Sequence, residues 1–424
     1  MLNIKQIIKE PKLIEERLKR KDPNLSLDPL LKAYDAFCKS KIASEEAVAT
    51  LNRLSKEIGE KKRQGIDTTS MMESVINAKQ AAQTLSEKQP ALEREYETLL
   101  SELPNLPDDD IKISPDPKEN VCIKMHGEKK SFNFPLKNHV ELGESLDLFD
   151  FKRGAKISGA GWPVYKGLGA RLEWALLNMM IETHIKNGFT FHLVPHLVRP
   201  QTMYGSGQLP KFEKQLFKLT DDDYDLFLIP TSEVSLNGLH SDEVIPDEDL
   251  PKLYTSYTPC FRREAGSHGK AERGLIRVHQ FNKVEMFAFT KPEDSDLIFE
   301  KMMKSAEEVL EKLELHYRNM LLVTGDMSYA AAKTVDIEVY LPGQDRYYEV
   351  SSVSNCRDFQ ARRSKIRYKK DQKALEFVHT LNGSGLATSR LMVALLENNQ
   401  NEDGSVTLPK ALRPYLDNRT HLSV

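Results

Sequence analysis

Apolar residues recur at steps of three and four in two series, one over residues 30–58 and one over residues 71–103. Both series follow the a and d positions of a coiled coil, with a few polar interruptions. Between them, Gly65 can end one helix, and Ser70 with Glu73 forms a capping box that can start the next. Two long helices joined by so short a turn must run antiparallel. The pattern therefore predicts a helical hairpin about 45–60 Å long.

Two features of this predicted hairpin stand out. Pro90 lies inside the second helix, where an interior proline costs about 3 kcal/mol, so we expect a kink there. The tip is basic, which is usual for a solvated helix end but also suits a surface that contacts phosphates. Its basic residues are Arg53, Lys56, Lys61, Lys62 and Arg63.

The composition of the chain changes near residue 104. Residues 104–117 are rich in proline and aspartate and predict a linker. Helical patterns follow over 168–186, 293–313 and 386–398, separated by strand-like runs at 189–195, 226–230, 257–287, 336–342 and 347–352. Strands outnumber βαβ units, which favours an antiparallel sheet with helices packed on it. We predict an α+β protein with a helical domain over 1–108 and a sheet domain over 109–424.

Composition and charge narrow the possible functions. The 424 residues include 60 Lys and Arg against 63 Asp and Glu, a net charge of −3, so any contact with nucleic acid must come from a local patch. No apolar run approaches the ~18 residues of a membrane span, and the first residues lack the apolar core of a secretory signal. The four cysteines are far apart and form no disulfide framework. We expect a reduced, soluble protein of the cytoplasm with no membrane partner.

Several common motifs are missing from the sequence. It contains neither a G-x-x-x-x-G-K-[ST] phosphate loop nor a G-x-G-x-x-G at a strand–helix junction. It has no H-E-x-x-H or Cys/His cluster, so we expect no zinc. No G-x-S-x-G nucleophile elbow is present.

Residues 259–287, PCFRREAGSHGKAERGLIRVHQFNKVEMF, carry the strongest chemical signal. They predict a hairpin with Arg262 and Glu264 at the end of its first strand and Glu285 on its second. An arginine can clamp a phosphate with two parallel hydrogen bonds, and a carboxylate can accept one from an adenine amino group. Taken alone, the Arg–x–Glu pair is explained equally well by a cross-strand salt bridge.

The whole string resembles motif 2 of the class II aminoacyl-tRNA synthetases, in particular the bacterial type of seryl-tRNA synthetase. Further segments resemble that family in its own order along essentially the full chain: motif 1 near 165–195, YGSGQLPKF at 204–212, TSEV at 231–234, EVSSVSNCRDFQARR at 349–363 and motif 3, NGSGLATSR, at 382–390. Departures are Trp162–Pro163 in place of Arg–Phe, Arg263 in place of a small residue, and the motif 2 loop GSHGKAERG.

The resemblance implies ATP-dependent activation of serine followed by transfer to tRNA. A carboxylate attacks the α-phosphate and expels pyrophosphate, so positioning and charge neutralisation carry the reaction. Arg262, Glu264 and Arg390 are implied as catalytic: Arg262 at the α-phosphate, Glu264 at the adenine amino group, and Arg390 at the γ-phosphate and, with Phe281, on the adenine ring. Further ATP-binding residues implied are Arg263, Val278, Glu349, Val350, Ser351 and Ser352.

The resemblance also implies a Mg²⁺ site and a serine pocket. Glu349 and Ser352 would hold Mg²⁺, a hard cation that prefers oxygen ligands. Glu285 would accept hydrogen bonds from the serine hydroxyl and ammonium groups, which excludes alanine because its binding would leave the carboxylate buried and unpaired. The serine-binding residues implied are Thr231, Ser232, Glu233, Glu285 and Ser384.

Macromolecular partners follow from the same resemblance. It implies a homodimer through motif 1, and a hairpin tip that grips the long variable arm of serine tRNA by shape and backbone contacts, with selenocysteine tRNA as a second substrate where the cell has one.

Alternatives remain open from the residues alone. Singly, Phe281 fits an apolar core, Thr231 and Ser384 fit turns, and Glu285 fits an ordinary salt bridge. The chain as a whole would also fit a relative that aminoacylates a carrier protein, an inactive paralogue, or a coiled-coil interaction protein whose α/β part only binds ATP. The first two usually lack the arm or the motif residues, and both are present here.

Overall fold

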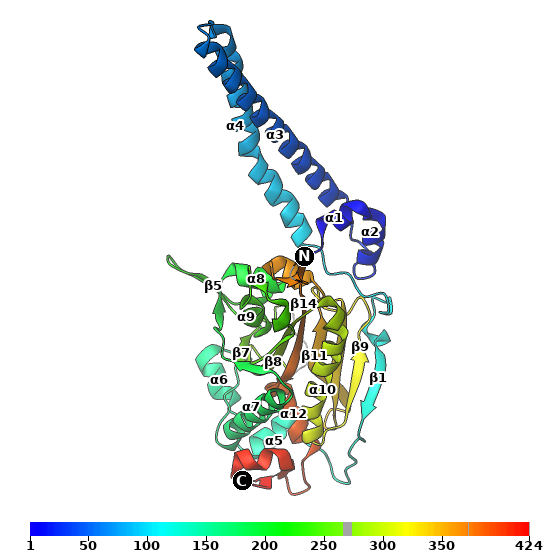
Figure 1. The fold of residues 1–424 in the computed structure, drawn as a ribbon. Coiled ribbons are helices and arrows are strands. Elements are labelled where there is room, and N and C mark those ends of the chain that lie inside the picture. The colour runs from blue at the N-terminus through cyan, green and yellow to red at the C-terminus, as the bar shows by residue number, and fades with distance from the viewer. Residues whose placement is uncertain (266–273, 372, 424) are drawn as a thin grey trace. The chain divides into compact units, whose positions relative to one another are not determined.

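The computed structural model describes residues 1–265, 274–371 and 373–423, without the side chain of Ser70 (Figure 1). Most of the predicted motif 2 loop, residues 266–273, therefore lies outside the described residues. The chain divides into two compact units. One comprises Leu2–Leu103, and the other comprises Pro104–Val424 together with Met1.

The first unit consists of the short helices α1 (Ile4–Lys9) and α2 (Pro11–Lys19) and the long helices α3 (Asp28–Arg63) and α4 (Thr69–Ser101). At 1.5 Å per residue, α3 and α4 are each about 50 Å long, and they form the predicted antiparallel hairpin. Gly65 ends α3 as expected: its φ is +76°, its N–H donates to Lys62 O, and the Ile66 N–H donates to Lys61 O. This pair of bonds is a Schellman motif.

The predicted start of the second helix is wrong by two residues, because Thr68 and not Ser70 is the N-cap. α4 begins at Thr69, so Ser70 already lies inside the helix and cannot cap it. The Asp67 carboxylate accepts from the Thr69 N–H at 2.9 Å and from its hydroxyl at 2.6 Å, which satisfies one free donor at this end. Pro90 lies inside α4, which continues without interruption to Ser101.

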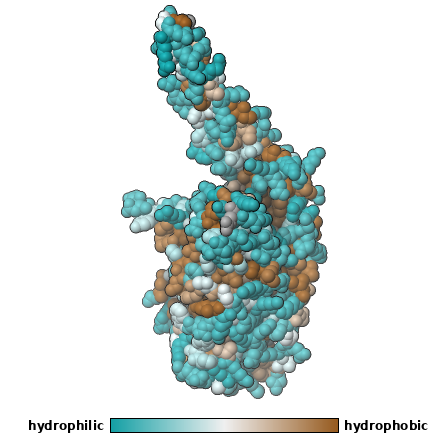
Figure 2. Space-filling view, viewed as in Figure 1, coloured by the Kyte–Doolittle hydropathy of each residue, from teal (hydrophilic) through white to brown (hydrophobic). Residues whose placement is uncertain are grey.

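Aromatic rings join the two long helices near their base. The Tyr34 and Tyr96 ring centroids are 5.2 Å apart in a T-shaped pair, and those of Phe37 and Tyr96 are 4.9 Å apart. Phe37 is buried, whereas Ile42 on the same helix is 56% exposed. Figure 2 shows that the surface of this hairpin is largely hydrophilic, so a narrow seam supplies most of its apolar contact.

The second unit is built on an eight-stranded sheet in the order β1-β9-β10-β11-β14-β8-β7-β2. All neighbours are antiparallel except β2 and β7, which are parallel. This confirms the predicted antiparallel sheet. The strands are β1 (Val121–His126), β2 (Thr190–His192), β7 (Lys252–Phe261), β8 (Gln280–Thr290), β9 (Tyr317–Leu321), β10 (Lys333–Leu341), β11 (Arg346–Asn355) and β14 (His379–Ala387).

Three helices pack on the sheet, α7 (Leu168–Lys186), α10 (Ser295–Lys312) and α12 (Thr388–Asn398), and α7 contacts each of the other two. Buried side chains such as Leu176, Met302 and Leu395 form the main core between them. The remaining helices are α5 (His139–Ser145), α6 (Phe151–Ser158), α8 (Pro200–Ser206), α9 (Glu233–Gly238) and α11 (Phe359–Ser364), with 3₁₀ turns at Pro117–Glu119, Glu213–Gln215, Asp247–Asp249, Pro292–Asp294 and Lys410–Leu416.

Short strands form three small additional sheets. They are β3 (Leu197–Val198), β5 (Asp225–Leu228) and β4 (Lys218–Thr220); β13 (Ala374–Phe377), β12 (Arg367–Lys370) and β6 (Val244–Ile245); and β15 (Val406–Thr407) with β16 (His421–Leu422). Within the described ranges, none of the helices combines the length and the apolar character that a membrane crossing requires.

The segment 104–117, predicted as a linker, is instead packed onto the second unit. The buried Asn105 amide donates to Ala330 O at 2.9 Å and to Cys356 O at 2.8 Å. Ile111 is buried in a small cluster with Leu322 and Met327. Proline and aspartate prevent a helix or strand here, but distant parts of the chain supply partners for the backbone and side chains.

The aromatic seam yields a prediction about stability. Phe37→Ala should destabilise the hairpin by about 3 kcal/mol, because it leaves a cavity beside Tyr34 and Tyr96. Urea unfolding of the full chain, followed by helical circular dichroism, should show an earlier transition for the hairpin. Ile42→Ala, at an exposed position of the same helix, is the control and should leave the transition unchanged. Equal midpoints for the two variants would contradict the role of the seam.

Candidate active site

One cavity in the second unit gathers residues from α8, α9, β8, β11, β14 and the start of α12, and from nearby loops that include the one after β7. Twelve of the residues implied by the motifs line it: Thr231, Glu233, Arg262, Glu264, Val278, Phe281, Glu285, Glu349, Val350, Ser352, Ser384 and Arg390. Three implied residues do not line it. Arg263 is exposed, Ser232 is buried behind Thr231, and the Ser351 hydroxyl donates to Ser384 O at 2.6 Å.

A bulge in β11 explains which of its residues face the cavity. The register with β10 shifts between Ile337 and Glu338, whose partners are Ser351 and Glu349, so Val350 is the extra residue. A bulge interrupts the alternation of faces along a strand. Glu349 and Ser352 consequently both line the cavity, although their spacing of three would place them on opposite faces of a regular strand.

The β7–β8 hairpin supplies the cationic wall of the cavity. The Arg262 guanidinium carbon lies 5.2 Å from the Phe281 ring centroid, within cation–π range, and Nε donates to Pro230 O at 3.4 Å. Glu264 forms an ion pair with Arg277 at 2.5 Å. The φ of Glu264 is +48°, a left-handed conformation uncommon for a residue with a side chain and frequent at functional sites.

Lys283, which the motifs did not point to, also lines the cavity. Its ammonium donates to Thr231 Oγ1 at 2.7 Å and forms an ion pair with Glu285, and both side chains of that pair are buried. The period of two along β8 could have found it, because Phe281, Lys283 and Glu285 share one face of the strand. A lysine here balances one of two neighbouring carboxylates, Glu285 and Glu233, among the four that line the cavity.

Glu233, the first residue of α9, is the second of those carboxylates. Its Oε1 accepts from the Gln360 amide at 2.6 Å and from the Asn382 amide at 3.1 Å. Burial, and then the charge of Glu285, raise its pKa to about 7. Among the described residues, the buried Ser384 Oγ has no hydrogen-bond partner. The pocket therefore offers a weakly acidic carboxyl and a free hydroxyl.

Oxygen groups gather where the motifs imply a metal. Glu349 is half exposed, and its Oε2 lies 3.3 Å from Arg390 Nη1. Asp336 pairs with Ser352 across β10 and β11, and its Oδ1 is buried with no partner among the described residues. Burial, followed by the nearby charge of Glu349, raises the Asp336 pKa well above its usual value. Oxygen ligands of this kind suit a hard cation such as Mg²⁺.

A search for metal-binding groups adds one observation. Over the described ranges, no three or more His, Cys, Asp and Glu side chains come together in an arrangement that could hold a metal ion.

The basic residues at the hairpin tip all lie on the last three turns of α3. Arg53, Lys56, Lys62 and Arg63 are exposed. Lys61 is half buried; its ammonium lies 3.0 Å from the Glu57 carboxylate and 3.4 Å from Met71 Sδ. Four of the five cations thus face solvent, and one is partly neutralised.

Comparison with known proteins places this geometry in a family. Residues 1–107 match the family model described as the seryl-tRNA synthetase N-terminal domain, and residues 217–399 match that of the tRNA synthetase class II core domain for G, H, P, S and T. The chain is 51% identical over 422 residues to a serine–tRNA ligase of Chlamydia abortus, covering 99% of each chain. It is 50% identical to that of Chlamydia pneumoniae, covering 98% of this chain and 97% of the relative.

Solved structures agree. The seryl-tRNA synthetase of Pyrococcus horikoshii complexed with ATP matches with a TM-score of 0.92 and 34% identity, covering 100% of this chain and 99% of that one. The cytoplasmic serine–tRNA ligase of Naegleria fowleri in complex with AMP matches with a TM-score of 0.86 and 25% identity, over 97% and 96% of the two chains. Since sequence and fold agree over nearly the whole length, the chain belongs to the seryl-tRNA synthetase family of class II aminoacyl-tRNA synthetases.

Proposed function

We propose that this chain activates L-serine with ATP and transfers the seryl group to serine tRNA, and to selenocysteine tRNA where the cell has one. One observation carries the proposal: a single cavity holds two cations suited to phosphates, Arg262 and Arg390, together with two carboxylates suited to an ammonium and a hydroxyl, the half-buried Glu233 and the buried Glu285. Family membership and the relatives solved with ATP and AMP support it.

In the first step, the serine carboxylate attacks the α-phosphorus of ATP, and the bond to pyrophosphate breaks. Serine gains the adenylyl group, and pyrophosphate leaves with the bonding electrons. Arg262 would neutralise the α-phosphate oxygens and Arg390 the γ-phosphate, while Glu264 accepts from the adenine amino group. Phe281 and Arg390 would hold the adenine ring between them. No general base is needed, because a carboxylate is already ionised at neutral pH.

The amino-acid pocket matches the charge of serine. Ionised Glu233 and Glu285 together with the Lys283 cation give a net charge of −1, which a substrate ammonium would neutralise. Glu285 would accept from the serine hydroxyl, and the free Ser384 Oγ would add a hydrogen bond. Lys283 would hold the Glu285 carboxylate in place through their ion pair, while it also donates to Thr231 Oγ1.

We further propose that Glu349 and Ser352 hold Mg²⁺, next to Asp336, which pairs with Ser352 on the neighbouring strand and has one unpartnered carboxyl oxygen. When bound, the cation would neutralise phosphate charge and orient the departing pyrophosphate. Arg390 orients Glu349, because its guanidinium contacts both the backbone carbonyl and the carboxylate of that residue.

The finer assignments concern assembly and tRNA. We propose a homodimer through the motif 1 segment, where Trp174 is 54% and Leu193 77% exposed, an unusual display of large apolar side chains.

We propose residues 1–108 as the tRNA-binding domain, 109–424 as the catalytic domain, and the cytoplasm, where ribosomes use charged tRNA, as the location. The hairpin tip would meet the RNA backbone, because its exposed cations suit phosphates.

Serine-dependent exchange between ATP and pyrophosphate tests the central proposal, with the other nineteen amino acids as controls. Arg262→Ala should reduce kcat by roughly 100-fold, because the clamp tightens as charge develops in the transition state. Glu285→Ala should mainly raise the KM for serine, by roughly 100-fold, because it leaves Lys283 buried and unpaired. Arg419→Ala, at an exposed position, should match the wild type. No exchange with any amino acid would refute the proposal, and equal losses of kcat with unchanged serine KM would refute the two roles.

The pKa of Glu233 predicts a pH dependence. Since that pKa is raised to about 7, the carboxyl is protonated below pH 7 and ionised above it. The KM for serine should therefore rise roughly ten-fold from pH 8 to pH 6, following the ionised fraction. In Glu233→Gln the KM should be higher throughout and nearly independent of pH. A flat wild-type profile, or the same slope in the variant, would contradict this role.

The hairpin predicts a separation of activities. Deleting residues 30–103 should leave serine–ATP exchange nearly intact and abolish tRNA charging, because the residues assigned to activation all lie in the second unit. Replacing Lys61, Lys62 and Arg63 by alanine should flatten the salt dependence of tRNA binding by up to about one unit per lost phosphate contact. Replacing Lys39 and Lys41, near the other end of α3, is the control. Normal charging by the deletion variant would contradict the assignment.

A further inference from the structure

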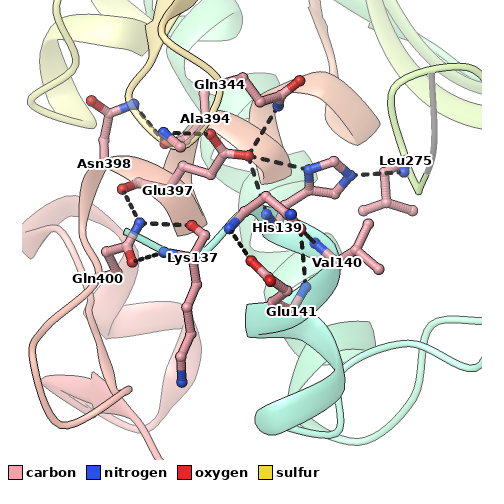
Figure 3. Close-up of polar contacts among 12 residues, drawn as sticks. Lys137, His139, Val140, Glu141, Leu275, Gln344, Ala394, Glu397, Asn398 and Gln400 are labelled. Carbon is pink, nitrogen blue, oxygen red and sulfur yellow. Dashed lines mark hydrogen bonds and ion pairs between the residues drawn. The ribbon is translucent and has the colours of Figure 1, made fainter. Parts of the chain in front are cut away.

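A buried His–Glu pair lies outside the residues that line the cavity (Figure 3). His139 is the first residue of α5, and Glu397 lies in the last turn of α12. Their exposed fractions are 3% and 0%, and His139 Nδ1 lies 3.2 Å from Glu397 Oε1. The proposed chemistry does not use either residue, so their burial needs another explanation.

Glu397 is surrounded by N–H donors. Besides the imidazole, its carboxylate accepts from the His139 backbone N–H at 3.1 Å, from the Gly343 N–H at 3.1 Å and from the Gln344 amide at 3.0 Å. Burial of a carboxylate is costly unless hydrogen bonds replace water, and here four donors do so. These four donors fix the position of the carboxylate as an acceptor.

The other imidazole nitrogen determines the tautomer. The Leu275 backbone N–H donates to His139 Nε2 at 3.3 Å. A backbone N–H can only donate, so Nε2 must present its lone pair, and Nδ1 must carry the proton that is donated to Glu397. His139 is thus a neutral relay that connects the carboxylate of α12 to the backbone of Leu275.

Leu275 begins a stretch of chain that reaches the nucleotide end of the cavity. Residues 276–278 follow it and line the cavity, and Arg277 in that stretch holds Glu264. Arg390 lies seven residues before Glu397, about two turns earlier on the same face of α12. The pair therefore joins the two segments that carry residues proposed to bind ATP from different sides.

Glycines allow the close approach at both ends of the pair. A Cβ on Gly274, whose φ is +73°, would lie 2.2 Å from His139 Nε2. A Cβ on Gly343 would lie 2.9 Å from Glu397 Oε2. No larger residue fits either place without displacing the pair.

We propose that His139, held by Glu397, is a positioning residue for the nucleotide site. It sets the distance between residues 276–278 and Arg390 through its bond to the Leu275 backbone, without contacting the substrate. This inference rests on the proposed function for its link to ATP, but the anchoring itself depends only on the contacts in Figure 3.

Two substitutions divide the roles of the two imidazole nitrogens. His139→Asn places an amide near Nδ1, which keeps the donor to Glu397 and removes the acceptor for Leu275. His139→Gln places its carbonyl near Nε2, which keeps that acceptor and removes the donor. ATP affinity is measured by calorimetry, the serine KM by pyrophosphate exchange, and the protection of the 274–278 amides by hydrogen exchange.

His139→Asn should weaken ATP binding about five- to ten-fold and speed exchange at Leu275 roughly ten-fold, with serine KM within about two-fold of wild type. His139→Gln should keep both ATP affinity and Leu275 protection near wild type, although both variants lose thermal stability. His316→Asn is the control: His316 is also buried and bonds to Gly127 O at 3.0 Å and to the Tyr347 hydroxyl at 2.8 Å, and neither partner lines the cavity.

Equal ATP affinities for the two His139 variants, or unchanged exchange at Leu275 in His139→Asn, would overturn the inference. A wild-type protein that shows no serine-dependent exchange would instead overturn the proposed function. Calorimetry and hydrogen exchange do not need turnover, so they would decide the anchoring in that case as well.

Discussion

The pleat of β8 is the constraint on which the site depends. This strand lies between β14 and β7 inside the sheet, so both of its edges are hydrogen-bonded and its register cannot slip. Val284, Met286 and Ala288 point into the main core, while Phe281, Lys283 and Glu285 point into the cavity. A shift by one residue would bury the two charges among the helices and expose the core side chains. Folding of the core therefore also places the charges of the site.

Limited access of water strengthens the interactions among the charges of the site. Glu233, Lys283 and Glu285 are enclosed, so their mutual interactions are weakly screened and the pKa of Glu233 rises to about 7. The arrangement costs stability, since Lys283 and Glu285 are both removed from water. In return it presents a pocket whose net charge is complementary to a single ammonium group. Such a pocket gives selectivity through the penalty for leaving a buried group unpaired.

The two units differ in how much apolar surface they bury. The second unit has a broad apolar core beneath its motif segments, whereas the hairpin has only a narrow seam that includes Phe37 and Tyr96. Long helices with such a seam provide reach and a charged end with few buried residues. Residues 104–117 belong to the second unit and are not a free linker, because Asn105 and Ile111 pack against other residues of that unit.

Sequence patterns determined much of the molecule. Heptad spacing predicted α3 and α4, the glycine signal located the end of α3, and strand-like runs predicted the antiparallel sheet. These features follow from local periodicity and from residues with special backbone preferences. The resemblance to known motifs identified twelve residues that line one cavity. The capping of α4 was mispredicted because the helix begins at Thr69, before Ser70, and Asp67 accepts from the Thr69 N–H.

Tertiary structure decided the rest. The bulge at Val350 turns Glu349 toward the cavity, and no local pattern announces a bulge that depends on the partner strand. The period of two along β8 places Lys283 on the same face as Glu285, but its hydrogen bond to Thr231, 52 residues away along the chain, exists only in the folded protein. The His139–Glu397 pair joins residues 258 positions apart. The sequence by itself determined which elements form, because those preferences are local; which buried charges meet, and in what protonation state, was decided by packing between distant segments, because burial and partners exist only in the folded chain.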